Sequence, residues 1–275
     1  MRVVEDAGGL ESTWGGVFVP TMGALHAGHA ALIERARGLA GGRAVVVSVF
    51  VNPTQFNERS DFERYPRSLE SDVAACERAG ADVVFAPSVE VMYPAGVKVD
   101  SPALPAVATQ PGLEDAHRPG HFAGVCQVCR RLFELVRPSR AVFGEKDWQQ
   151  LAVVRAMVAS LGLALEIVGH PTVREADGLA MSSRNALLAP NHRRRAAALH
   201  RALTEAAEHS DANEAEAAGR RVLLANRIVP EYFVVRDAAT LGDVRAGAAA
   251  RALVAARVGG VRLIDNECWP GSVAV

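Results

Sequence analysis

The run RAVVVSVFV at residues 43–51 constrains the fold more than any other feature of the sequence. Apolar residues fill nearly every position, which is the pattern of a strand covered on both faces. Short apolar runs recur at 16–20, 81–87, 140–144 and 164–171, and amphipathic stretches of helical length separate them. Strands that alternate with helices through short links predict a parallel sheet with helices on both of its faces.

The stretches between these strands have helical periodicity. The expected helices lie at 29–40, 68–80, 121–136 and 147–162. Right-handed crossovers through these helices would complete a Rossmann-like α/β domain, which we place at 1–174.

The rhythm of the sequence changes after about residue 175. We expect a smaller C-terminal α+β domain at 175–275, with helices over an antiparallel sheet. A Pro-rich stretch at 98–120 has no clear period, and so long a loop is usually a lid or a binding loop. The expected helices and strands of the second domain are 191–210, 213–227, 232–237, 251–258 and 261–269.

Composition narrows the function classes. The 275 residues carry a formal net charge of −1, so no global field attracts nucleic acid or an anionic membrane. No apolar run reaches the length of a membrane span, and no signal peptide opens the chain, which favours the cytoplasm. Cys126 and Cys129 form a CxxC, but without a second ligand pair we interpret them as small apolar side chains on a helix, and we expect no protein-held metal.

The stretch VPTMGALHAGHAALI at 19–33 places H-x-G-H between a strand and a helix. His26 and His29 flank Gly28 where helix N–H groups and the helix dipole favour a bound phosphate. Histidine can donate to phosphate oxygens and stabilise charge that grows on them. The spacing resembles the HIGH signature of nucleotidyltransferases, and the alternative is a helix cap with two surface histidines.

Two further stretches carry groups suited to a nucleotide. MSSRN at 181–185 offers two hydroxyls and a guanidinium for a triphosphate, although an ordinary turn has the same composition. FGEKDWQQL at 143–151 ends a strand, so Lys146 could reach a phosphate, while Asp147 suits a ribose hydroxyl or a helix cap. Gln150 lies one turn further along. These stretches and the H-x-G-H turn all follow strands, where open α/β sheets bind ligands.

Neutral amides follow another strand, in FVNPTQFN at 50–57. Asn52 and Gln55 suit a hydroxylated substrate, and the alternative is a proline turn with solvated amides. Arg118, in RPGHF, could bind a carboxylate or phosphate with both guanidinium nitrogens, or lie at a rim.

Taken in order, the motifs resemble one enzyme family. PTMGALHxGH, FVNPTQF, ERYPRSLESD, RPGHFAGV, FGEKDWQQL, TVREADGLAMSSRN and RLIDN together resemble the pantothenate synthetase family over nearly the whole chain. The resemblance implies that ATP, (R)-pantoate and β-alanine give pantothenate, AMP and diphosphate through a pantoyl adenylate. It also implies Mg²⁺ with ATP, a C-terminal lid domain and a homodimer, with small molecules as the other partners.

Residue by residue, the resemblance implies a catalytic role for His29 as proton donor, with help from His26, Lys146, Ser182, Ser183 and Arg184. It assigns pantoate and β-alanine to Gln55, Gln150, Asn52 and Arg118. The implied ATP contacts are Met22, Gly23, Ala24, Leu25, His26, Ala27, Gly28, His29, Gly144, Glu145, Lys146, Asp147, Val173, Met181, Ser182, Ser183 and Arg184.

Other functions share part of this logic. An H-x-G-H adenylyltransferase that acts on a phosphate substrate would release a dinucleotide-like product instead of AMP. A nucleotide-sensing domain would bind ATP without pantoate-dependent release of diphosphate. An aminoacyl-tRNA synthetase is disfavoured because the sequence shows no basic RNA-binding module.

Overall fold

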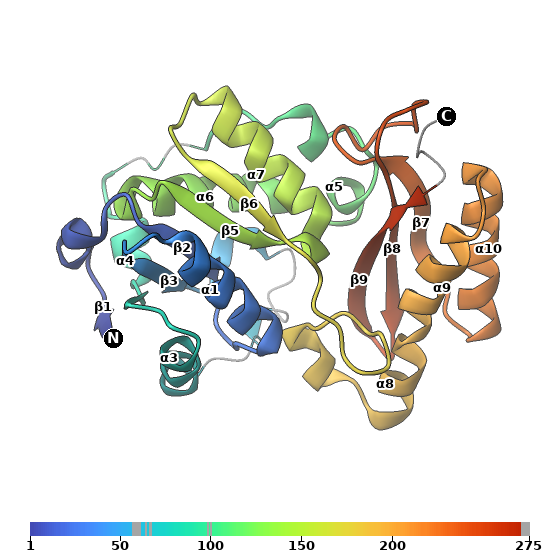
Figure 1. The fold of residues 1–275 in the computed structure, drawn as a ribbon, viewed down its shortest axis with the longest axis horizontal. Coiled ribbons are helices and arrows are strands. Elements are labelled where there is room, and N and C mark those ends of the chain that lie inside the picture. The colour runs from blue at the N-terminus through green and yellow to red at the C-terminus, as the bar shows by residue number, and fades with distance from the viewer. Residues whose placement is uncertain (57–61, 64, 66–67, 98, 100, 271–275) are drawn as a thin grey trace. The chain divides into compact units, whose positions relative to one another are not determined.

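The computed structural model describes residues 1–270 except 57–61, 64, 66–67, 98 and 100 (Figure 1). The chain divides into two compact units. The first unit comprises 1–145 and 153–171, and the second comprises 146–152 and 172–275.

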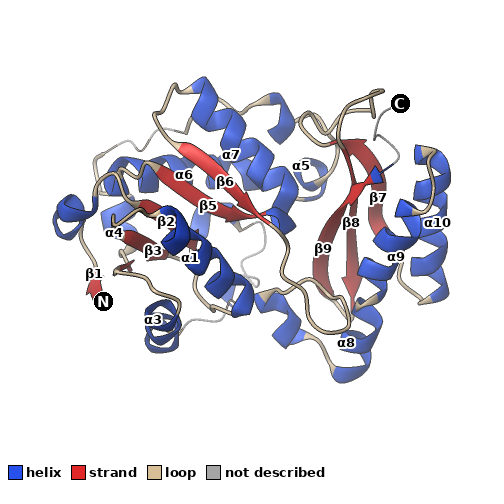
Figure 2. Cartoon of the chain, viewed as in Figure 1, coloured by secondary structure: helices blue, strands red, loops and turns tan. Residues whose placement is uncertain are grey.

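The first unit contains a six-stranded parallel sheet in the order β1-β4-β3-β2-β5-β6 (Figure 2). The five strands expected from apolar runs are present, as predicted. β1 was not predicted, because a strand of three residues, of which Arg2 and Val3 are exposed, is too short to give an apolar run. The strands are β1 (Arg2–Val4), β2 (Val17–Thr21), β3 (Val45–Val49), β4 (Val83–Phe85), β5 (Arg140–Gly144) and β6 (Glu166–His170).

Helices and short 3-10 turns connect these strands, and the four expected helices are confirmed. The Pro-rich stretch at 98–120 holds two short helical turns, which its sequence did not predict. The helices are α1 (Ala27–Leu39), α3 (Leu69–Arg78), α4 (Val89–Met92), α5 (Glu114–His117), α6 (His121–Val136) and α7 (Trp148–Ser160), with 3-10 turns η1 (Ala7–Thr13), η2 (Pro53–Gln55), η3 (Ala106–Ala108) and η4 (Glu145–Asp147).

Both faces of the parallel sheet are covered, as the run at 43–51 predicted. Val17 and Val19 of β2 belong to a buried cluster with Ile33 of α1. Phe18 points to the opposite face, where its ring lies edge-on to that of Phe133 in α6, with 6.3 Å between centroids. Alternate residues of one strand therefore serve the two helical layers.

The second unit contains an antiparallel sheet in the order β7-β8-β9, as expected. The helix expected at 191–210 is instead two helices that meet at Ala197, because an Ala-rich pattern does not show where a chain turns. The elements are η5 (Ser183–Leu187), α8 (Pro190–Ala196), α9 (Ala198–Ala207), α10 (Ala212–Ala225), β7 (Pro230–Asp237), β8 (Ala250–Val258) and β9 (Val261–Trp269).

Small residues let these helices approach the sheet closely. Ala198, Ala202 and Ala206 of α9 are fully buried in the core of the second unit. In α10, a Cβ added at Gly219 would lie 2.1 Å from the Phe233 ring, so glycine leaves room for that ring.

The cysteine pair of α6 behaves as the sequence predicted. Cys126 and Cys129 are buried, free thiols on the core side of the helix. Burial raises the pKa of the Cys126 thiol to about 11 and raises that of Cys129 as well. In the part of the chain that the structure describes, no helix combines the length and apolar character needed to cross a membrane.

Candidate active site

The turn between β2 and α1 has an unusual backbone. Gly23 and Ala24 both have positive φ, at 81° and 52°. Glycine adopts such angles freely, whereas alanine does so at an energetic cost and needs support from its surroundings. Thr21 begins that support, since its Oγ1 donates to Ser48 O at 2.6 Å and accepts from Gly23 N at 3.2 Å.

Asp72 of α3 supplies the rest of the support. Its side chain is buried, at 2% exposure, and accepts hydrogen bonds from Ala24 N (3.0 Å) and Leu25 N (2.8 Å). A Cβ at Gly23 would lie 2.7 Å from Asp72 Oδ2, so glycine is required for this approach. Sequence reasoning missed the role of Asp72, although the residue closes the ERYPRSLESD motif.

The two histidines of H-x-G-H form a capping box at the start of α1. His26 Nδ1 accepts from Gly28 N at 3.1 Å, and His29 Nδ1 accepts from His26 N at 3.3 Å. An Nδ1 that accepts a hydrogen bond carries no proton, so each neutral ring holds its proton on Nε2 and can donate from there. The predicted cap and the predicted donor role are therefore compatible: one nitrogen fixes the ring, and the other remains a donor.

The amides that follow β3 are buried instead of solvated. Asn52 (1% exposed) donates to Gln55 Oε1 at 3.1 Å and to Gly124 O at 3.2 Å. The Tyr93 hydroxyl donates to Asn52 Oδ1 at 2.8 Å, and burial raises the pKa of that hydroxyl. Gln55 Nε2 contacts Met22 Sδ at 3.0 Å. The alternative of a turn with solvated amides is therefore wrong. The amides that follow β3 contact the β2–α1 turn through Gln55 and Met22.

The start of α6 completes this cluster in the first unit. A Cβ at Gly124 would lie 2.5 Å from Thr54 O, so glycine lets α6 pack against η2. His121 Nδ1 lies 2.9 Å from Gln55 O, and Arg118 Nη1 lies 3.0 Å from His121 Nε2. Because a carbonyl only accepts and a guanidinium only donates, His121 is neutral with its proton on Nδ1. Sequence reasoning proposed Arg118 but missed His121, which the RPGHF motif contains.

The remaining residues of the first unit lie at the carboxyl ends of strands. Gly144 ends β5 opposite His170, which ends β6. Burial lowers the pKa of His170, and the Arg35 charge lowers it further. Glu145 follows Gly144 in the chain. A Cβ added at Gly169 would lie 3.0 Å from Glu145 Oε1, so glycine at this position leaves room for the carboxylate.

The other candidates belong to the second unit. Lys146 and Asp147 lie in η4, with 3.6 Å between Nζ and Oδ1, and Gln150 lies in α7. Met181 N donates to Val173 O at 2.9 Å, which brings these two predicted ATP contacts together.

Ser182, Ser183 and Arg184 open the 3-10 turn η5. Ser182 is the N-cap of this turn, because its Oγ accepts from Arg184 N at 3.3 Å. The turn alternative for MSSRN is thus correct as a description of backbone shape, and it is compatible with phosphate binding.

Together, the parallel sheet and a helix capped by H-x-G-H at its carboxyl edge define an α/β protein of the nucleotide-binding class. Comparison with known proteins identifies the particular family. The pantoate-beta-alanine ligase family model matches residues 8–268, and the chain belongs to this family.

Curated relatives agree over most of their length. The chain is 51% identical to a pantothenate synthetase of Thermus thermophilus over 269 residues, which cover 92% of this chain and 93% of the relative. It is also 51% identical to pantothenate synthetase of a Nocardioides species over 265 residues, which cover 90% and 77%.

Solved structures give the same result. The crystal structure of a Thermus thermophilus pantothenate synthetase superposes with a TM-score of 0.90 at 47% identity, covering 97% of this chain and 99% of that one. Pantoate-beta-alanine ligase of Francisella tularensis, complexed with beta-gamma ATP and beta-alanine, gives 0.79 at 31% identity, with 98% and 97% covered. The chain is therefore an enzyme of the pantoate–β-alanine ligases, and the adenylyltransferase alternative is not favoured.

Proposed function

We propose that the chain joins (R)-pantoate to β-alanine at the expense of ATP, through a pantoyl adenylate, and releases AMP and diphosphate. The family match over residues 8–268 supports the overall reaction. The capping box of His26 and His29 carries the proposal for the site, because it fixes two imidazoles as Nε2 donors at a helix N-terminus.

The first step activates the pantoate carboxylate. One carboxylate oxygen bonds to the α-phosphorus of ATP, and the bond from that phosphorus to the bridging oxygen breaks, so diphosphate leaves. Negative charge grows on phosphate oxygens, where donors already in place stabilise it most. We assign that task to Nε2 of His26 and His29, supported by the Asp72-held turn.

Further ATP contacts are proposed in each unit separately. In the first unit they are the backbone from Met22 to His29 with Gly144 and Glu145. In the second unit they are Lys146, Asp147, Val173 and Met181–Arg184. Mg²⁺ would enter with ATP as part of the substrate, because phosphate oxygens are the ligands that this hard cation prefers.

The second step uses β-alanine as the nucleophile. Its neutral amine attacks the acyl carbon, the acyl–oxygen bond of the mixed anhydride breaks, AMP leaves, and the nitrogen loses a proton as the amide forms. We assign the binding of pantoate and β-alanine to Gln55, Asn52, Arg118 and Gln150. These side chains accelerate the reaction by positioning the two reactants, and no protein nucleophile is required.

We further propose that the enzyme acts as a homodimer in the cytoplasm with a C-terminal lid domain at 175–275. The dimer and the lid domain rest on the resemblance of the motifs, whereas the cytoplasm is the expectation drawn from the sequence itself. Light scattering at assay concentration tests the dimer, and a monomeric mass would remove it.

Diphosphate release from Mg–ATP and pantoate, with and without β-alanine, tests the reaction. We expect a pantoate-dependent burst near one equivalent per site, and steady AMP formation after β-alanine is added. Pantoate-independent release by folded, ATP-binding protein would contradict the adenylate route. A phosphorylated acceptor replaces pantoate in a parallel reaction, and turnover with that acceptor alone would instead support an adenylyltransferase.

A further inference from the structure

The RLIDN motif, which spans part of β9 in the second unit, has no part in the chemistry above. Asp265 and Asn266 of this motif are both 2% exposed, and Arg251 on the neighbouring strand β8 is 6% exposed. Asp265 forms an ion pair with Arg174, and a buried ion pair rarely adds net stability over apolar packing of the same volume. Their burial therefore points to a positioning role.

Asn266 holds the segment that carries Lys146. Its Nδ2 donates to Lys146 O at 2.9 Å, and its Oδ1 accepts from Arg251 Nη1. The Arg251 guanidinium stacks 3.6 Å from the centroid of the Trp148 ring, and Trp148 Nε1 donates to Ala238 O at 2.9 Å. Residues 146–148 are thus fixed by backbone, by stacking and by a side-chain hydrogen bond.

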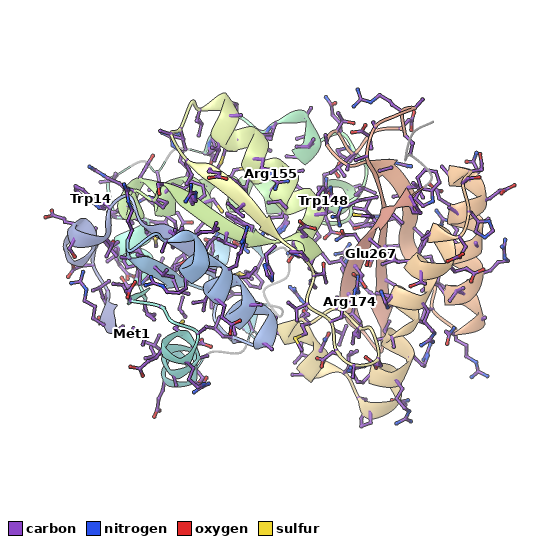
Figure 3. All side chains as sticks on the ribbon, in the orientation of Figure 1. Met1, Trp14, Trp148, Arg155, Arg174 and Glu267 are labelled. Carbon is purple, nitrogen blue, oxygen red and sulfur yellow. The ribbon has the colours of Figure 1, made fainter. Side chains whose placement is uncertain are left out.

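Asp265 holds the segment that carries Val173. Its two oxygens accept from Nη1 and Nη2 of Arg174 at 2.7 and 3.1 Å, and Arg174 Nη2 also reaches Glu267 Oε2 at 2.8 Å. Arg174 and Glu267 appear together beside β9 in Figure 3. Burial raises the pKa of the Asp265 carboxyl, and the paired guanidinium opposes that rise. The residue that follows Val173 is therefore anchored to the same strand as Lys146.

The two anchors are coupled through adjacent residues. Asp265 Oδ1 accepts from Asn266 N at 2.8 Å, and Arg174 Nη2 lies 3.3 Å from Asn266 O. Both segments are therefore hydrogen-bonded to adjacent residues of β9. A lysine side chain is long and flexible, so its reach to a phosphate depends on where its backbone is held.

We propose that Asp265 and Asn266 are positioning residues that set the backbone of Lys146 and of Val173 in register for ATP. This inference rests on the proposed function, because it takes those two segments as ATP contacts. Neither side chain touches the reacting atoms in this role, and each acts through the segment it holds.

The variant Asn266→Asp tests the proposal by replacing the side-chain NH2 group with an oxygen. It keeps the oxygen that Arg251 donates to, but places an acceptor against Lys146 O where the donor was. We expect ATP to bind about tenfold more weakly, because a hydrogen bond is replaced by a repulsive contact. The KM for β-alanine should stay within a factor of about two, since a positioning defect at the nucleotide leaves the amine subsite unaltered. Direct titration of Mg–ATP gives the dissociation constant without turnover.

Arg262→Gln is the matched control. Arg262 lies near the start of β9, four residues before Asn266, and pairs with Glu231 of β7 at 2.7 Å. The Arg262→Gln variant loses an ion pair of the same strand, and we expect its ATP affinity to stay at the wild-type value. Equal ATP affinities of Asn266→Asp and Arg262→Gln overturn the inference, as does an equal rise in the KM for β-alanine.

A second variant decides the matter if Asn266→Asp does not fold. Glu267→Gln removes the charge of one partner of Arg174 on an edge strand, where the Glu267 side chain is 43% exposed, so folding tolerates it. We expect a two- to threefold loss of ATP affinity, roughly the value of one partly exposed charge pair, and an unchanged affinity overturns the proposal. Failure of the proposed function is seen separately, as absence of pantoate-dependent diphosphate release by the wild-type enzyme.

Discussion

The two units support their candidate residues in different ways. In the first unit, candidates follow parallel strands, and a single side chain, Asp72, holds the β2–α1 turn by accepting from two of its backbone N–H groups. In the second unit, Lys146 and Val173 lie outside the antiparallel sheet and depend on a connected network of buried polar side chains.

Sheet geometry explains this difference. The carboxyl ends of parallel strands share one edge, so a parallel sheet brings the loops that follow its strands to the same edge. Neighbouring ends of an antiparallel sheet alternate in direction, and segments brought to it from elsewhere in the chain need their own anchors. Two equally buried carboxylates illustrate the contrast: Asp72 accepts from two backbone N–H groups, whereas Asp265 pairs with a guanidinium.

The largest expected effect concerns the chemistry of the first unit. His29→Ala removes a proposed Nε2 donor, and kcat for diphosphate release should fall about 10²- to 10³-fold, as for loss of one oxyanion donor. His29→Asn is the control, because its side-chain oxygen can still accept from His26 N and preserve the cap. Both variants should melt near the wild-type temperature. A near-normal rate for His29→Ala would remove this residue from the mechanism.

The next effect tests whether the Asp72 side chain holds the β2–α1 turn of the first unit. Asp72→Ala leaves Ala24 N and Leu25 N without their acceptor, and should cost about 2–4 kcal/mol of unfolding free energy. ATP affinity should fall with it, since the turn loses its positive-φ backbone. Glu70→Ala, an exposed change in the same helical turn, is the control. Urea unfolding measures the unfolding free energy, and titration measures the ATP affinity. If both quantities are the same for Asp72→Ala and Glu70→Ala, the turn does not depend on Asp72.

A smaller effect concerns close packing beside the buried amides. Gly124→Ala forces α6 away from η2, which should cost about 2–3 kcal/mol, as overpacking does in other cores. The KM for pantoate should rise, because Gln55 moves with η2. Gly38→Ala is the control: a Cβ there meets nothing within 4 Å, and alanine should stabilise α1 by about 0.5–1 kcal/mol. Identical pantoate KM values for the two variants would contradict the proposal that Gln55 contacts pantoate.

The smallest effect belongs to the second unit and depends on pH. Burial raises the pKa of Asp237, but hydrogen bonds from Thr240 and Arg245 outweigh it and hold the pKa at about 2. A carboxyl with a depressed folded-state pKa stabilises the fold above its unfolded pKa and loses that contribution as pH falls.

Asp237→Asn should therefore lower the unfolding free energy by about 1 kcal/mol at pH 7, a modest value because Arg245 is largely exposed. The difference from wild type should narrow as the pH falls from about 4 toward 2. Urea titrations at several pH values measure it. A difference that stays constant with pH would mean that shape, and not charge, explains the loss.

Local patterns in the sequence determined the architecture and the motifs. Continuous apolar runs predicted the five main strands, and 3.6-residue periodicity predicted α1, α3, α6 and α7, because both signals arise within one short segment. The H-x-G-H turn was recognisable for the same reason: a strand, a glycine turn and a helix follow one another directly.

Tertiary structure alone decided which groups support that chemistry. Asp72 reaches a turn 47 and 48 residues earlier, and Asn266 reaches a carbonyl 120 residues earlier, so no periodic signal marks either contact. The proton on Nε2 of His26 follows from a backbone bond to Nδ1, which the sequence does not show. Sequence specifies segments through their own periodicity, whereas hydrogen bonds between distant segments exist only once the chain has packed, and these bonds fix the geometry of the site.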